Sequence, residues 1–352
     1  MKKYFLLLIL LIIPIRVKGL SASSVTLMDM DTNRVLYSYN QSDSRLIASI
    51  TKIMTAYVAI NNANIKDMVI VDESVLKSYG SGIYVEVGEE ISLEDLLYGL
   101  MLRSGNDAAI QIANYVAGSM EGFVELMNST AISLGMKNTK FINSSGLENN
   151  DGVGNTSTSY DMALLMSKAM ENEIFRTIVS TKKRSVKTNY KTYIWYNKNK
   201  LLNNYEYCTG GKTGFTEKAR RTLVTTATKD NMNFVVVTLN DPNDFNDHQV
   251  LYEEYFNKYK SYKILDSKNL NFNKKNYYIK NDKYLTLTSD EYKRIIKEVI
   301  YYKENVSDIV GVIKIKLDEN ILLSEYIYEK IEVKNDVKKS FFDKIIDFFK
   351  GL

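Results

Sequence analysis

A single lysine interrupts an otherwise apolar stretch of this 352-residue chain. Lys52 is the only charged side chain between Arg45 and Lys66, and residues 46–60 are apolar on almost every face of a helix. A helix of this kind is predicted to be buried. Burying an ammonium without a partner is costly, so a lysine in this setting needs a chemical reason. Ser49 lies three residues earlier, one helical turn away, where its hydroxyl can reach the amine.

The first 19 residues have the pattern of a secretory signal. Lys2 and Lys3 precede an apolar run over residues 4–15, and small residues follow at 19–23. The run is shorter than the roughly 20 residues that span a bilayer. We therefore expect residues 1–19 to be a signal peptide, with cleavage after residue 19 or 22, and the mature protein to be exported.

Composition excludes several classes of function. Residues 1–19 hold four basic residues and no acidic one, so the rest of the chain has 42 of each. This leaves no sign of the basic surface of a nucleic-acid-binding protein. Cys208 and His248 are the only residues of their types, so neither a metal nor another cofactor is expected. One histidine also gives little support to a Ser-His-Asp triad, which leaves a lysine as the candidate base.

Periodicity predicts an α+β fold with two domains. Strand patterns occur in residues 23–38 and, joined as a hairpin by a turn at 229–232, in residues 222–228 and 233–239; they flank several helical segments. We expect residues 23–262 to form a first domain with an antiparallel sheet and helices, and residues 263–332 to form a small β-rich domain. The predicted helices cover residues 46–60, 92 to a break near 104–105, 108–116, 122–135, 160–170 and 247–259.

The segment 340–352 is predicted to form an amphipathic helix. Its apolar face consists of Phe341, Phe342, Ile345, Ile346, Phe349 and Leu352. A helix of 13 residues reaches about 20 Å, too short to span a bilayer. We expect it to lie on the membrane surface, the alternative being a helix docked on the protein's own body.

Two further strings add the parts of a serine acyl-transfer site. Ser104-Gly105-Asn106, at the predicted helix break, offers a hydroxyl and an amide, and Lys212-Thr213-Gly214 offers a cation and a hydroxyl where backbone can approach a ligand. The first string alone is typical of a helix cap. The second is not a phosphate loop, because residue 206 is Glu where G-x-x-x-x-G-K-[ST] needs Gly. Burial and a second cation such as Lys212 would lower the pKa of Lys52, so that its neutral amine could take the proton of Ser49.

With these strings in this order, the chain resembles the low-molecular-mass penicillin-binding proteins of the serine D-Ala-D-Ala carboxypeptidase family. The resemblance covers residues 23–262 and extends well beyond the three strings. Matching segments are residues 48–56, 95–100, 104–109, 123–128, 134–136, 157–163 and 211–216, together with Asn197, Asn199, Leu201 and Leu202.

The resemblance implies a fold and four catalytic roles. The first domain would have the β-lactamase/transpeptidase-like fold, followed by the β-rich domain and the terminal amphipathic helix. Ser49 would be the acylated nucleophile and Lys52 its base. Ser104 would relay a proton toward the leaving amine, and Asn106 would hold Lys52 and the substrate amide.

Four more residues are implied to bind the substrate. Lys212 and Thr213 would bind the terminal carboxylate of D-alanine, with Gly214 and Phe215 beside them, and the N–H groups of Ser49 and Phe215 would form the oxyanion hole. The implied reaction removes the terminal D-alanine from peptidoglycan pentapeptide stems through an acyl-enzyme. Its implied partners are the stem peptide, β-lactam antibiotics as covalent inhibitors, and the outer face of the bacterial membrane.

Two other functions remain open at this point. A serine β-lactamase would need a carboxylate that activates the deacylating water, and Glu125 offers one, although it also fits an amphipathic helix. A non-catalytic cell-wall-binding protein of the same fold would have no need of a buried base. The chain also departs from the family at Ile47, where Pro is frequent, and at Arg220 and Arg221, near a common Ala-Gly pair. The two arginines could change acceptor access or substrate preference.

Overall fold

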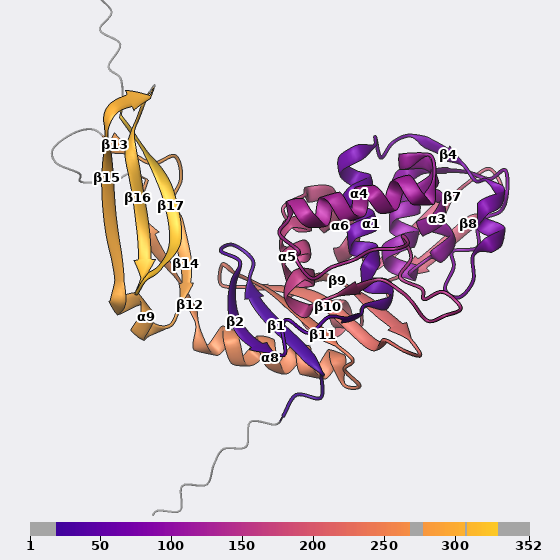
Figure 1. Ribbon diagram of the computed structural model, residues 1–352, viewed down its shortest axis with the longest axis horizontal. Helices are drawn as coiled ribbons and strands as arrows, with labels where there is room; N and C mark the ends of the chain where they lie inside the picture. The colour runs from indigo at the N-terminus through magenta and orange to yellow at the C-terminus, as the bar shows by residue number, and fades with distance from the viewer. Residues whose placement is uncertain (1–18, 268–276, 307, 330–352) are drawn as a thin grey trace, which may run out of the picture. The chain divides into compact units, whose positions relative to one another are not determined.

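The computed structural model describes residues 19–267, 277–306 and 308–329. It divides into two compact units, one ending at Lys260 and the other beginning at Ser261 (Figure 1). The predicted terminal helix and the predicted signal up to residue 18 lie outside the described residues. Within the described ranges, no helix combines the length and the apolar composition needed to cross a membrane.

The first unit is built on a five-stranded antiparallel sheet in the order β2-β1-β11-β10-β9. The strands are β1 (Ser24–Asp29), β2 (Arg34–Tyr39), β9 (Cys208–Thr216), β10 (Arg220–Lys229) and β11 (Met232–Leu239). The central strands are runs of valine and threonine, whose branched side chains favour a pleated sheet. Asp230 and Asn231 both have positive φ, as a two-residue hairpin turn requires, and they join β10 to β11 where the sequence predicts a hairpin.

Helices cover both faces of this sheet (Figure 1). Helix α8 (Asp244–Lys258) packs on one face, where Leu201 of the short helix α7 (Leu201–Asn204) joins its buried cluster, and the other helices lie toward the opposite face. They are α1 (Lys52–Asn62), α2 (Leu93–Tyr98), α3 (Asn106–Ala117), α4 (Met120–Ser133), α5 (Ser159–Ala169) and α6 (Glu173–Ser180), with short helical turns η1 (Ala48–Thr51), η2 (Glu73–Lys77) and η3 (Gly99–Arg103). Three two-stranded ladders complete the unit: β3 (Arg45–Leu46) with β6 (Thr156–Ser157), β4 (Met68–Ile70) with β5 (Glu90–Ser92), and β7 (Lys183–Lys187) with β8 (Thr192–Tyr196).

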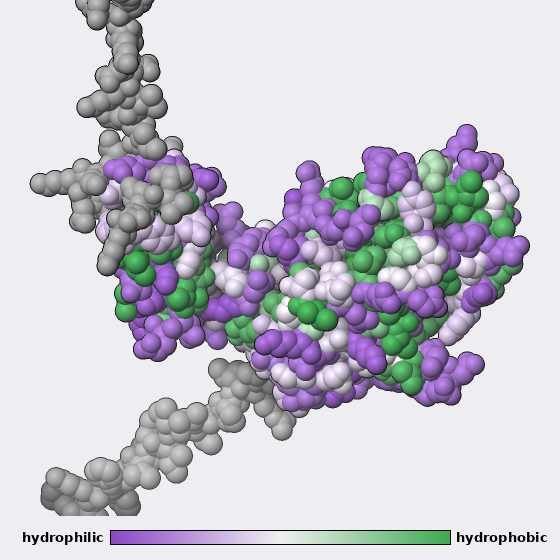
Figure 2. Space-filling view, turned by 45° about the horizontal axis from the view of Figure 1, so that its top comes forward, coloured by the Kyte–Doolittle hydropathy of each residue, from purple (hydrophilic) through white to green (hydrophobic). Residues whose placement is uncertain are grey.

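The two faces of the sheet bury separate cores because side chains alternate along each strand. Val235 and Val237 of β11 contact the large helical core, whereas Phe234 and Val236 contact α8. On that second face, the ring of Phe234 stacks on Phe256 at 4.7 Å. On the face of the molecule drawn in Figure 2, hydrophilic and hydrophobic residues are interspersed over the surface of the unit.

One predicted helix differs in the structure. Residues 46–60 were expected to form a single helix, but β3 and η1 precede α1, which begins only at Lys52. The reason is the backbone conformation at residue 48. Ala48 has φ of 48°, a left-handed conformation that an α-helix does not contain.

The second unit is β-rich, as the sequence predicts. Strand β12 (Lys260–Leu265) pairs with β14 (Lys283–Leu287), and a second sheet has the order β13-β17-β16-β15. Its strands are β13 (Tyr277–Tyr278), β15 (Ile295–Val306), β16 (Ile309–Leu317) and β17 (Asn320–Glu329). The short helix α9 (Ser289–Arg294) starts with a capping box of Thr288 and Glu291. The buried core of the second unit is aliphatic and includes Ile313, Ile315 and Ile327.

Candidate active site

Ser49 lies on η1, a single turn that runs directly into α1. The left-handed conformation of Ala48 costs a non-glycine residue about 1 kcal/mol and persists only where the surroundings fix it. Here the surroundings are β10, because the hydroxyl of Thr222 donates a hydrogen bond to the carbonyl of Ile47 at 3.0 Å. The turn leaves Ser49 half-buried, while Lys52, at the start of the helix, is fully buried.

The amine of Lys52 is surrounded by three oxygen atoms. Its Nζ lies 3.0 Å from Ser49 Oγ, 2.8 Å from Asn106 Oδ1 and 2.6 Å from the carbonyl oxygen of Ser145. The pKa of Lys52 is lowered to about 7, mainly by burial and to a smaller extent by the charge of Lys198, while Asp107 acts in the opposite direction. The amine is therefore neutral in a large share of molecules at neutral pH.

The neutral amine has the right contacts for a general base. It can donate its two N–H groups to the oxygens of Asn106 and Ser145, neither of which has a proton to offer there. Its lone pair then faces the hydroxyl of Ser49 at 3.0 Å, within the range for proton transfer.

The second string lies between η3 and α3, at the break that the sequence predicts. Ser104 has φ of 65°, and Asn106 is the first residue of α3. The Asn106 amide is fixed in orientation, since its Nδ2 donates to the Tyr79 carbonyl at 2.7 Å while its Oδ1 faces Lys52. The adjacent carboxylate of Asp107 accepts hydrogen bonds from the backbone N–H groups of Ile83 and Tyr84, which fixes the neighbouring loop.

The third string lies on β9. The strand pattern there is weak in the sequence, because residues 210, 211 and 214 are glycines. Gly214 allows this strand to approach the nucleophile, since a Cβ there would lie 3.0 Å from the backbone nitrogen of Ser49. Lys212 is fully buried, and its Nζ donates to the carbonyl of Thr213 at 2.7 Å. Burial, followed by the charges of Lys52 and Lys198, lowers the pKa of Lys212 well below its usual value. Among the described strands, β9 is the last of this sheet, so one row of its backbone groups has no strand partner there.

The structure brings all eight predicted site residues together. A cavity of about 320 Å³ is lined by Ser49, Ser104, Thr213, Gly214 and Phe215, with Ser81, Lys198, Lys200, Arg221, Asp244 and Phe245. The other three predicted residues, Lys52, Asn106 and Lys212, are buried next to members of this lining.

Sequence reasoning missed two participants. Ser145 contributes a backbone carbonyl, which no side-chain motif can reveal; the signal nearest to it is the run of small polar residues that ends at Gly146. A Cβ at Gly146 would lie 2.0 Å from the carbonyl oxygen of Ala48, so this segment packs directly against the nucleophile turn. Lys198 lies between Asn197 and Asn199, which carry the resemblance to the family, but is not itself part of that match.

The groups that rival mechanisms would use lie elsewhere. His248 is fully buried under the sheet, between the hydroxyls of Thr225 and Thr238, and burial lowers its pKa to about 3. Glu125 is exposed on α4 and does not line the cavity at Ser49.

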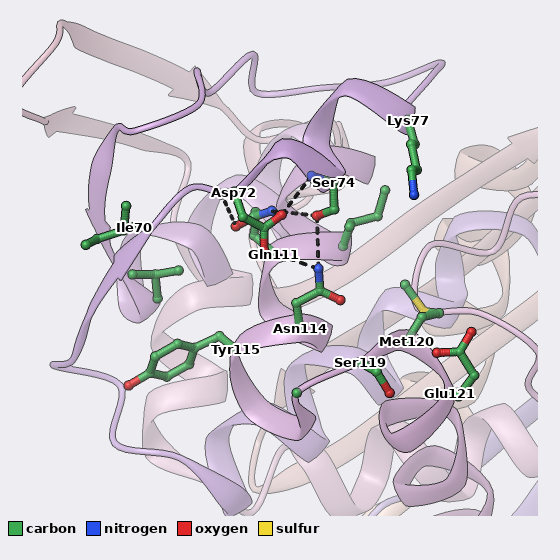
Figure 3. A pocket seen from close by; sticks show the side chains of 13 residues that line it. Ile70, Asp72, Ser74, Lys77, Gln111, Asn114, Tyr115, Ser119, Met120 and Glu121 are labelled. Atoms are coloured by element: carbon green, nitrogen blue, oxygen red, sulfur yellow. Dashed lines mark hydrogen bonds between the residues drawn. The ribbon is translucent and has the colours of Figure 1, made fainter.

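A larger cavity, of about 540 Å³, is distinct from this site (Figure 3). It lies between η2 and the facing ends of α3 and α4. Four of its polar side chains form hydrogen bonds with one another: Gln111 Nε2 donates to Asp72 and Ser74, and Asn114 Nδ2 donates to Ser74. Asp72 also caps η2. Asp72, Ser74, Gln111 and Asn114 therefore have a structural role, which is to hold the start of η2 against α3. We assign no reaction to this cavity.

Comparison with known proteins gives the family. A family model described as D-alanyl-D-alanine carboxypeptidase matches residues 15–243. The chain belongs to this family. It is similar to the D-alanyl-D-alanine carboxypeptidase DacF of Bacillus subtilis, with 30% identity over 346 residues that cover 91% of this chain and 87% of that protein. It is 36% identical over 248 residues to DacC of Escherichia coli, covering 66% of this chain and 60% of that one.

Solved structures agree on the fold of this carboxypeptidase. The Streptomyces K15 DD-transpeptidase superposes with a TM-score of 0.64 and 31% identity, covering 68% of this chain and 98% of that one. The α+β fold of the penicillin-binding enzymes, implied by the resemblance, is therefore confirmed. The chain is a serine-type D-Ala-D-Ala carboxypeptidase, and the β-lactamase and non-catalytic alternatives are set aside.

Proposed function

We propose that Ser49 is the nucleophile of this carboxypeptidase and that Lys52 is its general base. The observation that carries the proposal is the contact between the two: a fully buried amine with a pKa of about 7 lies 3.0 Å from the hydroxyl. A serine hydroxyl needs such a base to become an effective nucleophile.

The reaction then follows from the positions of the other groups. The neutral amine of Lys52 takes the hydroxyl proton as Ser49 Oγ attacks the carbonyl carbon between the two D-alanines. The N–H groups of Ser49 and Phe215 hold the oxyanion that forms. The proton passes through Ser104 to the leaving amine, the C–N bond breaks, and D-alanine leaves from Thr213 and Lys212. Water then attacks the ester on Ser49 and releases the shortened stem.

Asn106 has two tasks in this proposal. It holds the Lys52 amine through Oδ1, and the N–H of Nδ2 that does not go to the carbonyl of Tyr79 donates to the substrate amide. A further cavity, of about 250 Å³, lies against Asn106 and Ser145, and we assign to it the acyl part of the stem peptide.

The test measures two reactions side by side. The purified protein is given a peptide that ends in D-Ala-D-Ala, and released D-alanine is quantified next to penicillin hydrolysis. We expect D-alanine release, and slow loss of penicillin with one drug mass added to the protein. Rapid penicillin turnover without peptide cleavage would contradict the assignment.

We further propose that the protein acts on the outer face of the bacterial membrane, with residues 1–19 as the export signal and residues 340–352 as a surface anchor. The supporting observation is the amphipathic pattern of the terminal segment. Deleting residues 340–352 is expected to move the mature protein from the vesicle-bound to the soluble fraction while D-alanine release from a soluble peptide stays unchanged. Unchanged partitioning would refute the anchor.

A further inference from the structure

We propose that Arg221 binds a second carboxylate on the leaving group, so that the enzyme prefers a leaving D-amino acid unit that carries an acid besides its own α-carboxylate. This inference rests on the proposed function, which places the leaving D-alanine beside Thr213. It extends that function by naming the substrate class that this side of the site takes.

Arg221 is held in place at the wall of the catalytic cavity. Its Nε donates to Asp244 Oδ2 at 3.1 Å, and its Nη2 donates to Oδ1 at 2.7 Å. The Asp244 side chain is only 5% exposed, whereas that of Arg221 is 44% exposed. A bidentate pair of this kind fixes the plane of the guanidinium. Because the group has five N–H donors and Asp244 takes two, three remain for a ligand.

The same cavity holds more positive charge than one carboxylate balances. Lys198 and Lys200 line it together with Arg221, while Asp244 is the one acidic residue in its lining. Lys198 Nζ donates to the hydroxyl of Ser81, and Lys200 Nζ lies 5.9 Å from the ring of Phe245; neither forms an ion pair with a described carboxylate. The chain as a whole is nearly balanced, with 46 basic and 42 acidic residues, so this surplus is local.

Two further features favour an anion at this place. Helix α8, of 15 residues, begins at Asp244, and its positive N-terminal end therefore lies at the cavity wall. Low-dielectric walls around charges of one sign also strengthen the local field. A lone D-alanine would bring one carboxylate to this environment, and that carboxylate is already assigned to Thr213 and Lys212.

The size of the cavity agrees with a larger leaving group. Its volume of about 320 Å³ is far above the roughly 10–15 Å³ that one water molecule needs on the same measure. Alanine has six non-hydrogen atoms and leaves much of that space to solvent. An amino acid with an acidic side chain, or a second peptide stem joined through an amine next to its carboxylate, fills more of it.

The chemistry of bond cleavage is unchanged by this proposal. The C–N bond to the leaving amine breaks, the acyl group stays on Ser49, and the amine takes the proton relayed by Ser104. Only recognition differs, because a second carboxylate reaches the guanidinium of Arg221. Asp244 acts as a positioning residue, since it holds the arginine without contacting the substrate.

The neighbouring Arg220 provides a matched control. Its side chain is 59% exposed, lies 3.6 Å from the exposed carboxylate of Glu217, and is not part of the cavity lining. Arg220→Gln therefore removes the same charge from the same strand without touching the proposed contact.

The experiment compares three peptides with an identical acyl part, ending in D-Ala-D-Ala, D-Ala-D-Glu and D-Ala-D-Gln. The last two differ only in the side-chain charge of the leaving residue. For the wild type we expect kcat/KM to be about tenfold higher with D-Glu than with D-Gln, the range of one charge-assisted hydrogen bond. Arg221→Gln should bring this ratio close to one, whereas Arg220→Gln should keep it. Lys200→Gln should lower the ratio two- to threefold, and it replaces Arg221→Gln if that variant does not fold. Penicillin labelling shows whether each variant is folded.

Several outcomes would overturn the inference. The first is a D-Glu to D-Gln ratio of one or less in the wild type, and the second is a ratio that stays unchanged in Arg221→Gln. The third is an equal loss of kcat/KM for all three peptides in that variant, because the arginine would then bind the α-carboxylate that they share. The proposed function is tested separately by D-alanine release from the first peptide. If the wild type releases D-alanine but does not distinguish D-Glu from D-Gln, the inference alone fails.

Discussion

Ser49→Ala is expected to abolish covalent labelling by penicillin and to lower D-alanine release at least about 10³-fold. The substitution removes the oxygen atom that forms the acyl-enzyme, and no other described hydroxyl lies within hydrogen-bond distance of the Lys52 amine. Loss of one oxygen from a half-buried side chain leaves the surrounding turn intact, so the variant should fold. Mass spectrometry of the protein after incubation with penicillin gives the result directly.

The control for this experiment is Ser133→Ala. Ser133 is exposed near the end of α4 and donates only to the carbonyl of Thr130, so both labelling and turnover should match the wild type. A penicillin adduct that persists in Ser49→Ala would show that another residue is the nucleophile.

Lys52→Gln is the second substitution with a large expected effect. It keeps Ser49 and much of the volume of the side chain but removes the group that takes the hydroxyl proton. General-base catalysis contributes roughly 10²–10⁴-fold, so the second-order rate of penicillin acylation should fall by about that factor. Stopped-flow or mass-resolved labelling measures this rate without the need for turnover.

Lys66→Gln is the matched control for Lys52→Gln. Lys66 pairs with Glu94 at 2.6 Å, but its side chain is 70% exposed. Exposed pairs contribute little, so both acylation and stability should stay near those of the wild type. If Lys52→Gln acylates as fast as Lys66→Gln, another group must act as the base.

The parts of the fold that were predictable have strong local signals. Ser92 caps α2 by accepting from Asp95 N, as its sequence pattern indicates. The turn at Asp230 and Asn231 follows from two residues that tolerate positive φ. The Ser49 and Lys52 pair could be predicted because Lys52 is the one charged residue in an apolar stretch. This signal does not depend on where the helix begins.

The parts that were not predictable depend on contacts distant in sequence. The left-handed Ala48 that ends the expected helix 46–60 is held by Thr222, which is 175 residues away from Ile47. The Ser145 carbonyl that completes the Lys52 site belongs to the backbone and leaves no mark in the side-chain pattern. The sequence also could not distinguish Arg220 from Arg221; the first is exposed beside Glu217, and the second reaches the catalytic cavity because Asp244 holds it there.

The measurement that tests this account most directly is a titration of the Lys52 amine in the free enzyme, followed by NMR of Nζ-labelled lysine with Lys52→Gln as the assignment control. Burial disfavours the charged form, so the midpoint should lie at about 7, against about 10.4 for an exposed lysine. The acylation rate should rise with pH through the same midpoint, since only the neutral amine accepts the proton. An amine that remains charged up to about pH 10, as an ordinary lysine does, would contradict the mechanism.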